Sequence, residues 1–186
     1  MGRISRIERN ESALVIIDVQ EALMKSMIPE VGKNIIRNLQ ILITFASKME
    51  IPILVTEQYP KGLGRTIPEI KKKLGSIAPI EKVSFSCCGV ETFNERLSRL
   101  GRRQILLSGI EAHVCVLQTA IELIQKGYEV DVLADAVCSR RKLDWEIGLR
   151  WMESGGAMIV TTEIVAFQLL KEAGTEEFKI LSKLLR

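Results

Sequence analysis

A cysteine placed just after a short apolar run is the residue of this chain best suited to chemistry. Cys115 follows the run that begins at Ile105, and a helical pattern starts directly after it. A strand-to-helix turn offers free backbone N–H groups and the positive end of a helix dipole, which favour a thiolate. The position predicts a nucleophilic cysteine with a depressed thiol pKa, with a buried, inert cysteine as the alternative.

Two further polar residues also follow apolar runs. Asp18 comes directly after residues 13–17, and Lys82 comes after the weaker run 77–81. Taken singly, Asp18 is equally well explained as a helix N-cap, and Lys82 is more simply an exposed lysine. Taken together with Cys115 they form a chemical set. Asp18 can accept the thiol proton, Lys82 can stabilise the thiolate and the aspartate, and the sulfur can attack an electrophilic carbon.

The elements that must position these residues alternate along the chain as short apolar runs and longer amphipathic stretches. Runs that are apolar throughout favour a parallel sheet covered on both faces, with ligands beyond the carboxyl ends of the strands. We therefore expect an α/β fold with three α/β/α layers and a six-stranded, Rossmann-like parallel sheet, in a single domain spanning residues 1–186. The expected strands are 13–17, 51–55, 77–81, 104–108, 129–134 and 157–161, and the expected helices are 33–49, 66–74, 90–100, 114–126, 143–154, 162–172 and 176–185.

Composition narrows the class of protein. The chain has 186 residues, of which 47% are apolar and 26% charged, and its formal net charge is +3. These values are typical of one globular domain, and no basic stripe with interleaved aromatic residues indicates nucleic-acid binding. The charged N-terminus has no apolar leader, and no apolar stretch is long enough for a membrane span. Together with four cysteines that lack ligand spacing, this predicts a cytoplasmic protein that binds neither nucleic acid nor membrane.

Three sequence motifs resemble those of one known family. They are Leu14-Val-Ile-Ile-Asp-Val-Gln20, Glu81-Lys-Val-Ser-Phe85 and Gly109-Ile-Glu-Ala-His-Val-Cys-Val-Leu-Gln-Thr-Ala120. In order and spacing they are similar to the Asp, Lys and Cys segments of the isochorismatase-like cysteine hydrolase superfamily. The segment Thr56-Glu-Gln-Tyr-Pro-Lys-Gly-Leu-Gly64 further resembles the isochorismatase domain-containing subgroup. The resemblance extends from about residue 12 to residue 167.

This resemblance implies a mechanism and an assembly. Asp18 would deprotonate Cys115 and Lys82 would stabilise charge, so that the thiolate attacks a carbonyl and gives an acyl-enzyme for water to hydrolyse. A non-proline cis peptide is expected before Glu111. The backbone N–H groups of this turn, at Glu111 and Ala112, and that of Cys115 would form an oxyanion hole. A homo-oligomer, either a dimer or a tetramer, is also implied.

Four residues are candidates for contact with a small-molecule substrate. Gln20 and Gln58 carry amides that can orient a carbonyl, and Tyr59 offers an apolar ring and a hydroxyl. The loop from residue 58 to 64 is either a lid or a plain connection. His113 lies two residues before the cysteine, where a structural hydrogen bond competes with substrate contact.

Departures from better-known relatives restrict the reaction. Nicotinamidases of the superfamily hold a metal with an Asp and two His residues, whereas residues 56–60 contain no histidine and His113 is the only one in the chain. We therefore expect neither metal nor cofactor. True isochorismatases lack a cysteine at the position of Cys115, so hydrolysis of a small amide or amide-like C–N bond fits better. The alternative is a non-catalytic or redox-responsive metabolite- or partner-binding protein, with Cys87 or Cys138 as a resolving thiol.

Overall fold

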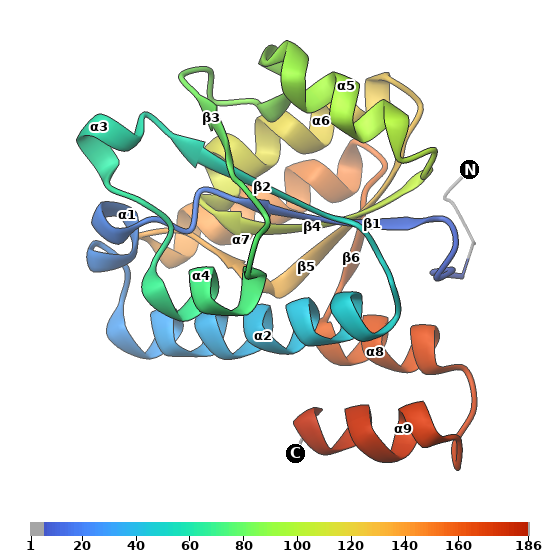
Figure 1. The fold of residues 1–186 in the computed structure, drawn as a ribbon. Coiled ribbons are helices and arrows are strands. Elements are labelled where there is room, and N and C mark those ends of the chain that lie inside the picture. Colours follow the sequence, from blue (N-terminus) through green and yellow to red (C-terminus); the bar gives the residue numbers. More distant parts are fainter. Residues whose placement is uncertain (1–5, 186) are drawn as a thin grey trace.

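Six parallel strands form the centre of the molecule (Figure 1). The computed structural model describes residues 6–185, so residues 1–5 and 186 of the expected domain lie outside the described residues. The strand order is β3-β2-β1-β4-β5-β6, and every pairing is parallel. The strands are β1 (Ser12–Ile17), β2 (Ile53–Gln58), β3 (Ile80–Lys82), β4 (Gln104–Ile110), β5 (Glu129–Cys138) and β6 (Met158–Val160).

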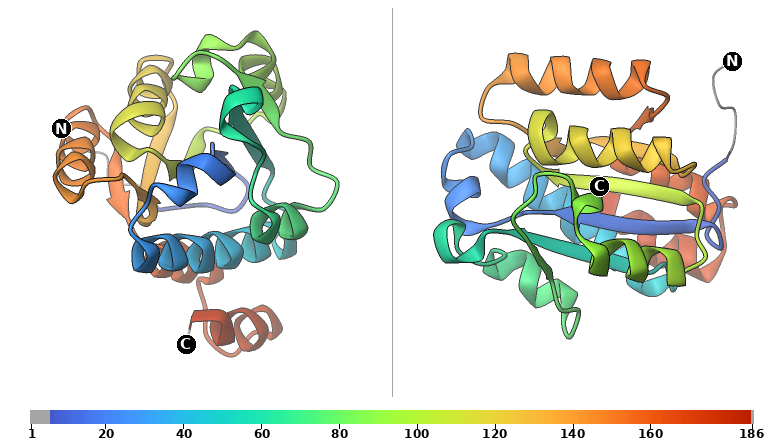
Figure 2. Two further views of the ribbon diagram at one scale, coloured as in Figure 1. Left: turned by 90° about the vertical axis from the view of Figure 1, so that its left-hand side faces the viewer. Right: turned by 90° about the horizontal axis from the view of Figure 1, so that it is seen from above.

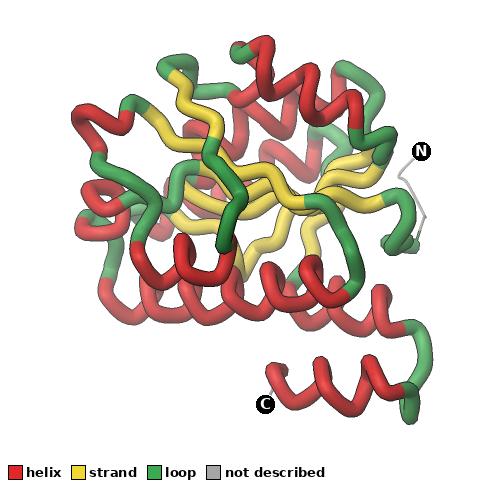
Figure 3. The backbone as a smooth tube through the Cα atoms, viewed as in Figure 1, coloured by secondary structure: helices red, strands yellow, loops and turns green. Residues whose placement is uncertain are grey.

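Helices cover both faces of this sheet (Figures 1 and 2). One layer contains α2, α4 and α8, with α9 packed outside α8, and the other contains α5, α6 and α7. Figure 3 shows the same three layers by element type. The helices are α1 (Glu21–Lys25), α2 (Pro29–Lys48), α3 (Pro60–Leu63), α4 (Pro68–Leu74), α5 (Glu91–Arg99), α6 (Leu117–Gln125), α7 (Lys142–Ser154), α8 (Thr162–Leu170) and α9 (Glu176–Leu181), with short turns at η1 (Cys87–Gly89), η2 (Ala112–Val116) and η3 (Ser182–Leu185).

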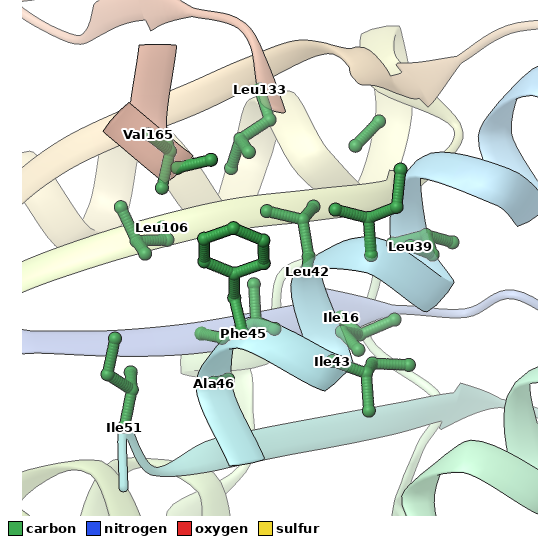
Figure 4. Packing of buried hydrophobic residues seen from close by; sticks show 14 of the residues in the cluster. Ile16, Leu39, Leu42, Ile43, Phe45, Ala46, Ile51, Leu106, Leu133 and Val165 are labelled. Carbon is green, nitrogen blue, oxygen red and sulfur yellow. The ribbon is translucent and has the colours of Figure 1, made fainter. Parts of the chain in front are cut away.

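The sheet is buried because apolar side chains leave both faces of its central strands. All six residues of β1 and all seven of β4 are buried. On one face, Phe45 and Leu42 of α2 pack against Leu106 of β4 (Figure 4). On the other, Val15 of β1 belongs to the cluster formed by α5, α6 and η2. Two-sided burial explains why the strands read as continuous apolar runs.

The expected fold class is confirmed, with differences at several element ends. The helix predicted from residue 114 begins as a π-helical turn, η2, and continues as α6. The helices α1 and α3 were not predicted, because each has fewer than six residues and shows no helical period. The first long helix begins at Pro29 rather than at residue 33, since proline is well suited to the first helical position.

The strand order reverses between β1 and β4, which places a topological switch point at their carboxyl ends. Gly109 allows these two strands to approach there. A Cβ atom at this position would lie 2.1 Å from the backbone oxygen of Ile17, and its φ is +114°. Only glycine meets both demands. The helices α1 and α3 lie at this carboxyl edge, in front in the left view of Figure 2.

Candidate active site

Asp18 is held at the carboxyl end of β1 by the neighbouring strand β2. Its side chain is fully buried, and its φ of 52° turns the chain sharply after the strand. The backbone N–H of Asp18 donates to Thr56 O at 3.2 Å, and the Thr56 hydroxyl donates to Asp18 Oδ1 at 2.7 Å. One carboxylate oxygen is therefore fixed, and the other faces the end of β3.

Lys82, the last residue of β3, meets that second oxygen. Its Nζ lies 2.7 Å from Asp18 Oδ2, and both side chains are fully buried. The ammonium also donates to Gln58 Oε1 at 2.7 Å, to Phe85 O at 2.9 Å and to Ser84 O at 3.2 Å. A lysine has three N–H donors, and these three acceptors match them. Within residues 6–185, Asp18 Oδ2 has no hydrogen bond of good geometry, so the contact with Nζ is an ion pair.

Cys115 completes the group from the turn η2. Its side chain is 5% exposed. Burial raises the pKa of the Cys115 thiol to about 12. The negative charge of Asp18 acts in the same direction, as does the contact of the thiol with that carboxylate, whereas Lys82 opposes the shift. The predicted depressed pKa is therefore wrong. Burial of the thiol and the charge of the adjacent carboxylate raise the pKa by more than the turn and the lysine lower it.

The turn before Cys115 contains the expected cis peptide, between Ile110 and Glu111. The backbone oxygen of Glu111 accepts from Val114 N at 3.1 Å and from Val116 N at 3.2 Å. Its carboxylate accepts from the backbone N and the Nε of Arg140 at 3.2 and 2.9 Å. Hydrogen bonds to the backbone oxygen and to the side-chain carboxylate of Glu111 thus hold the turn in place, and the neighbouring Ala112 is fully buried. The oxyanion role of Glu111 and Ala112 stays a prediction.

The two glutamines predicted to contact substrate are both buried and bonded within the protein. Gln20 Oε1 accepts from Gln58 N at 2.7 Å, and its Nε2 donates to Gln58 O at 2.9 Å and to Gly64 O at 2.7 Å. Gln58 Nε2 donates to Val83 O at 2.8 Å, while its Oε1 accepts from Lys82. Both amides are used to fix the chain around the lysine.

The other two substrate candidates occupy different positions. Tyr59 is 53% exposed and lines a surface pocket of about 530 Å³ together with Lys82, Val83 and Val90. His113 Nδ1 lies 2.9 Å from Ser139 Oγ, which is the structural hydrogen bond considered as its alternative role. The structure thus places Tyr59 in a surface pocket at the end of β3, and it connects His113 to the end of β5.

Sequence reasoning missed two threonines around Asp18, Lys82 and Cys115. Thr56 orients Asp18, and Thr119 Oγ1 donates to Cys115 O at 2.6 Å and accepts from Cys87 N at 3.0 Å. The Cys87 sulfur lies 3.8 Å from Thr56 Oγ1. A threonine in a strand or helix carries no local signal of such a role. The register of β1 against β2, which aligns Ile17 with Thr56, would have indicated the first of them.

Within residues 6–185, no group of three or more His, Cys, Asp or Glu side chains is arranged to hold a metal ion. Across the same residues, none of the helices combines the length and apolar character needed to cross a bilayer.

Comparisons with known proteins agree on one family. The model of the isochorismatase domain matches residues 12–164. Isochorismatase domain-containing protein 2 of Xenopus laevis is 38% identical over 187 residues, which cover 100% of this chain and 88% of the relative. The structure of a MAR1 ribonuclease from Caenorhabditis elegans has a TM-score of 0.89 at 38% identity, over 97% of this chain and 92% of that one. The YcaC gene product of Escherichia coli, an octameric hydrolase of unknown specificity, shares the fold with a TM-score of 0.85 at 24% identity, over 92% and 85% of the two chains.

Proposed function

The chain belongs to the isochorismatase family, and from this premise we propose that it is a metal-independent cysteine hydrolase that cleaves a small amide or amide-like C–N bond. Asp18, Lys82 and Cys115 act as its catalytic triad. The observation that carries the proposal is the buried Asp18 carboxylate in contact with the Cys115 thiol, with its Oδ2 2.7 Å from Lys82 Nζ. A carboxylate in that state is a competent acceptor for the thiol proton.

The reaction begins with transfer of the Cys115 thiol proton to Asp18 Oδ2. The sulfur attacks the carbonyl carbon as the proton leaves, because the resting thiol, with a pKa of about 12, supplies almost no thiolate on its own. The tetrahedral oxyanion would be bound by the backbone N–H groups of Ala112 and Cys115. The Lys82 ammonium balances the negative charge as that charge moves between carboxylate, sulfur and oxygen.

Collapse of the tetrahedral intermediate breaks the C–N bond. The proton held by Asp18 passes to the leaving nitrogen, the amine departs and a thioester remains on Cys115. Water then attacks the thioester, gives its proton to Asp18 and releases a carboxylic acid, and the proton returns to sulfur. No step needs an oxidant, a reductant or a metal.

The surroundings of the triad favour a small substrate. Asp18 is fully buried, and Cys115 and Lys82 are 5% and 4% exposed. A surface pocket of about 530 Å³ lies over the end of β3, lined in part by Lys82 and Val83, and its volume is within the range of small-molecule sites; its lining residues do not include Asp18 or Cys115. Tyr59 lines this pocket and is assigned a substrate contact. Gln20, Gln58 and His113 would act through other residues, because their side chains already bond to the protein.

The test is hydrolysis of a panel of small primary amides, anilides and imides, followed by amine release and by intact mass for a thioester adduct. Wild type should hydrolyse at least one class of compound, and Cys115→Ala should lose both activity and adduct. Cys138→Ala is the matched control. Cys138 is also a buried thiol, 2% exposed and with a pKa of about 12, but the carboxylate near it is that of Glu111. Equal activity in wild type and Cys115→Ala would refute the proposal.

Assembly and substrate class in the relatives supply further outcomes to check. The E. coli fold relative is described as octameric, and we extend only homo-oligomer formation to this chain, as a dimer or larger assembly. The C. elegans relative is described as a ribonuclease, so RNA belongs in the substrate panel. Cleavage of RNA that survives Cys115→Ala would assign a different reaction to this fold. The cytoplasmic location stays a prediction.

A further inference from the structure

The ammonium of Lys82 has more acceptors around it than hydrogens to give. Four oxygens lie within 3.2 Å of Nζ, and they belong to Asp18, Gln58, Phe85 and Ser84. Three of these contacts have hydrogen-bond geometry, and the one that does not is Asp18 Oδ2. Gln58 Oε1 makes the shortest of the three, at 2.7 Å.

We infer that Gln58 is a positioning residue for the proposed reaction, which holds one N–H of Lys82 away from Asp18 Oδ2 and so keeps that oxygen free to accept the Cys115 proton. A hydrogen bond from a cation to a carboxylate stabilises its charged form and weakens it as a base. The ion pair without that bond still balances charge. Gln58 therefore separates two functions of Lys82, neutralising the aspartate and hydrogen bonding to it.

The hydrogen bonds that hold Gln58 in place support this role. Its backbone N–H and carbonyl are both bonded to the side chain of Gln20, and its Nε2 donates to Val83 O at 2.8 Å. The donation to Val83 fixes which end of the amide faces Lys82, because the nitrogen is already used. Gln58 is 8% exposed, and one N–H of its Nε2 is already bonded to Val83 O. Gln20 thus supports Gln58, and Gln58 supports Lys82.

This inference rests on the proposed function in one respect, namely that Asp18 is the base. The experiment follows the rate of alkylation of Cys115 by iodoacetamide against pH, in the full-length protein, by peptide mass. It needs no substrate. The variants are Gln58→Met, which removes the acceptor at similar volume, and Gln58→Glu, which keeps an acceptor and adds negative charge.

In Gln58→Met the freed N–H turns to Asp18 Oδ2. The acid limb is the part of the profile where the alkylation rate falls at low pH, and the plateau is the pH-independent part above it. We expect the acid limb to move to lower pH and the plateau rate to fall by about 10- to 100-fold, which is the effect of one hydrogen bond to a charged group. In Gln58→Glu the acid limb should move to higher pH, because the added charge favours protonation of Asp18. If Gln58 had only a structural role, the acid limb would stay at the wild-type pH in both variants.

The control for folding is Gln104→Met. Gln104 is 4% exposed, and its Nε2 donates to Arg6 O at 2.7 Å at the opposite end of the sheet. This variant should lose stability and keep the wild-type acid limb. An unchanged acid limb in both Gln58 variants, with a plateau in wild type, would overturn the role of Gln58 alone. Absence of any plateau in wild type would instead overturn Asp18 as the base. If Gln58→Met does not fold, Gln58→Glu decides by the direction of its shift.

Discussion

Asp18→Asn tests the proposed role of Asp18 as the base, because its effect on the reactivity of Cys115 depends on pH. With a pKa of about 12, direct ionisation leaves a thiolate fraction on the order of 10⁻⁵ at neutral pH. Transfer of the proton to Asp18 involves no exchange with solvent. Alkylation of wild type should therefore be independent of pH between about pH 6 and pH 8, above the acid limb.

The variant behaves in the opposite way. Removing the carboxylate removes a charge that raises the pKa of Cys115, while Lys82, which lowers it, remains. The pKa should fall, and the thiolate fraction should then rise about tenfold for each pH unit, or about 100-fold from pH 6 to pH 8. Amide hydrolysis should be lost across that range, because no group carries the proton to the leaving nitrogen.

The assay is peptide mass spectrometry of iodoacetamide-treated protein, with Cys138 in the same digest as an internal reference for a buried thiol. Asp18→Asn leaves the Lys82 charge buried, which costs roughly 3–5 kcal/mol, so thermal denaturation must first show that the variant is folded. A wild-type rate that rises tenfold per pH unit, parallel to that of the variant, would refute Asp18 as the base. An alkylation rate of the variant that does not change with pH would refute the assignment of opposing effects of Asp18 and Lys82 on the pKa of Cys115.

Three further predictions concern the frame of the site and its oxidation. Gly109→Ala should destabilise the protein by more than about 3 kcal/mol in denaturant unfolding, since its Cβ would lie 2.1 Å from the β1 backbone, whereas Gly127→Ala, with open space at φ +87°, should cost only about 1–2 kcal/mol. Burial acts to raise the pKa of Glu57, but hydrogen bonds from Thr66 and Arg65 outweigh it and lower the pKa below 4.5. Glu57→Gln should therefore be less stable than wild type at neutral pH, and the difference should vanish as pH falls through the lowered value. Hydrogen peroxide should give little Cys115–Cys87 disulfide in non-reducing peptide maps at neutral pH.

The sheet was predictable because its signal is local. The buried central strands are runs of apolar residues, and the long helices repeat with a helical period. The order of the elements along the chain and the fold class therefore follow from the sequence alone. The short elements at the carboxyl edge, α1 and α3, lack that signal and depend on tertiary contacts. Gln20, for example, bonds to Gly64 O just after α3, a contact 44 residues away in sequence.

The sequence predicted that Asp18, Lys82 and Cys115 lie together, but not the electrostatics of the group they form. Asp18 and Cys115 follow β1 and β4, and Lys82 is the last residue of β3, so their convergence comes from parallel topology. The thiol pKa depends on burial and on the carboxylate beside it, and neither is encoded near Cys115. The same holds for Gln58, whose amide is a plausible substrate ligand in sequence and a partner of Lys82 in the structure.

The protonated resting thiol also separates the hydrolase from its redox-responsive alternative. Oxidation by peroxide follows thiolate character and exposure, and Cys115 has little of either, with a pKa of about 12 and 5% exposure. Cys87 is fully buried and its pKa is likewise about 12, so it is a poor resolving thiol at rest. In the proposed mechanism Asp18 takes the proton as the sulfur attacks an electrophilic carbon, so a hydrolase does not need a resting thiolate. The raised thiol pKa and the burial of Cys115 therefore both act against reaction with a dissolved oxidant.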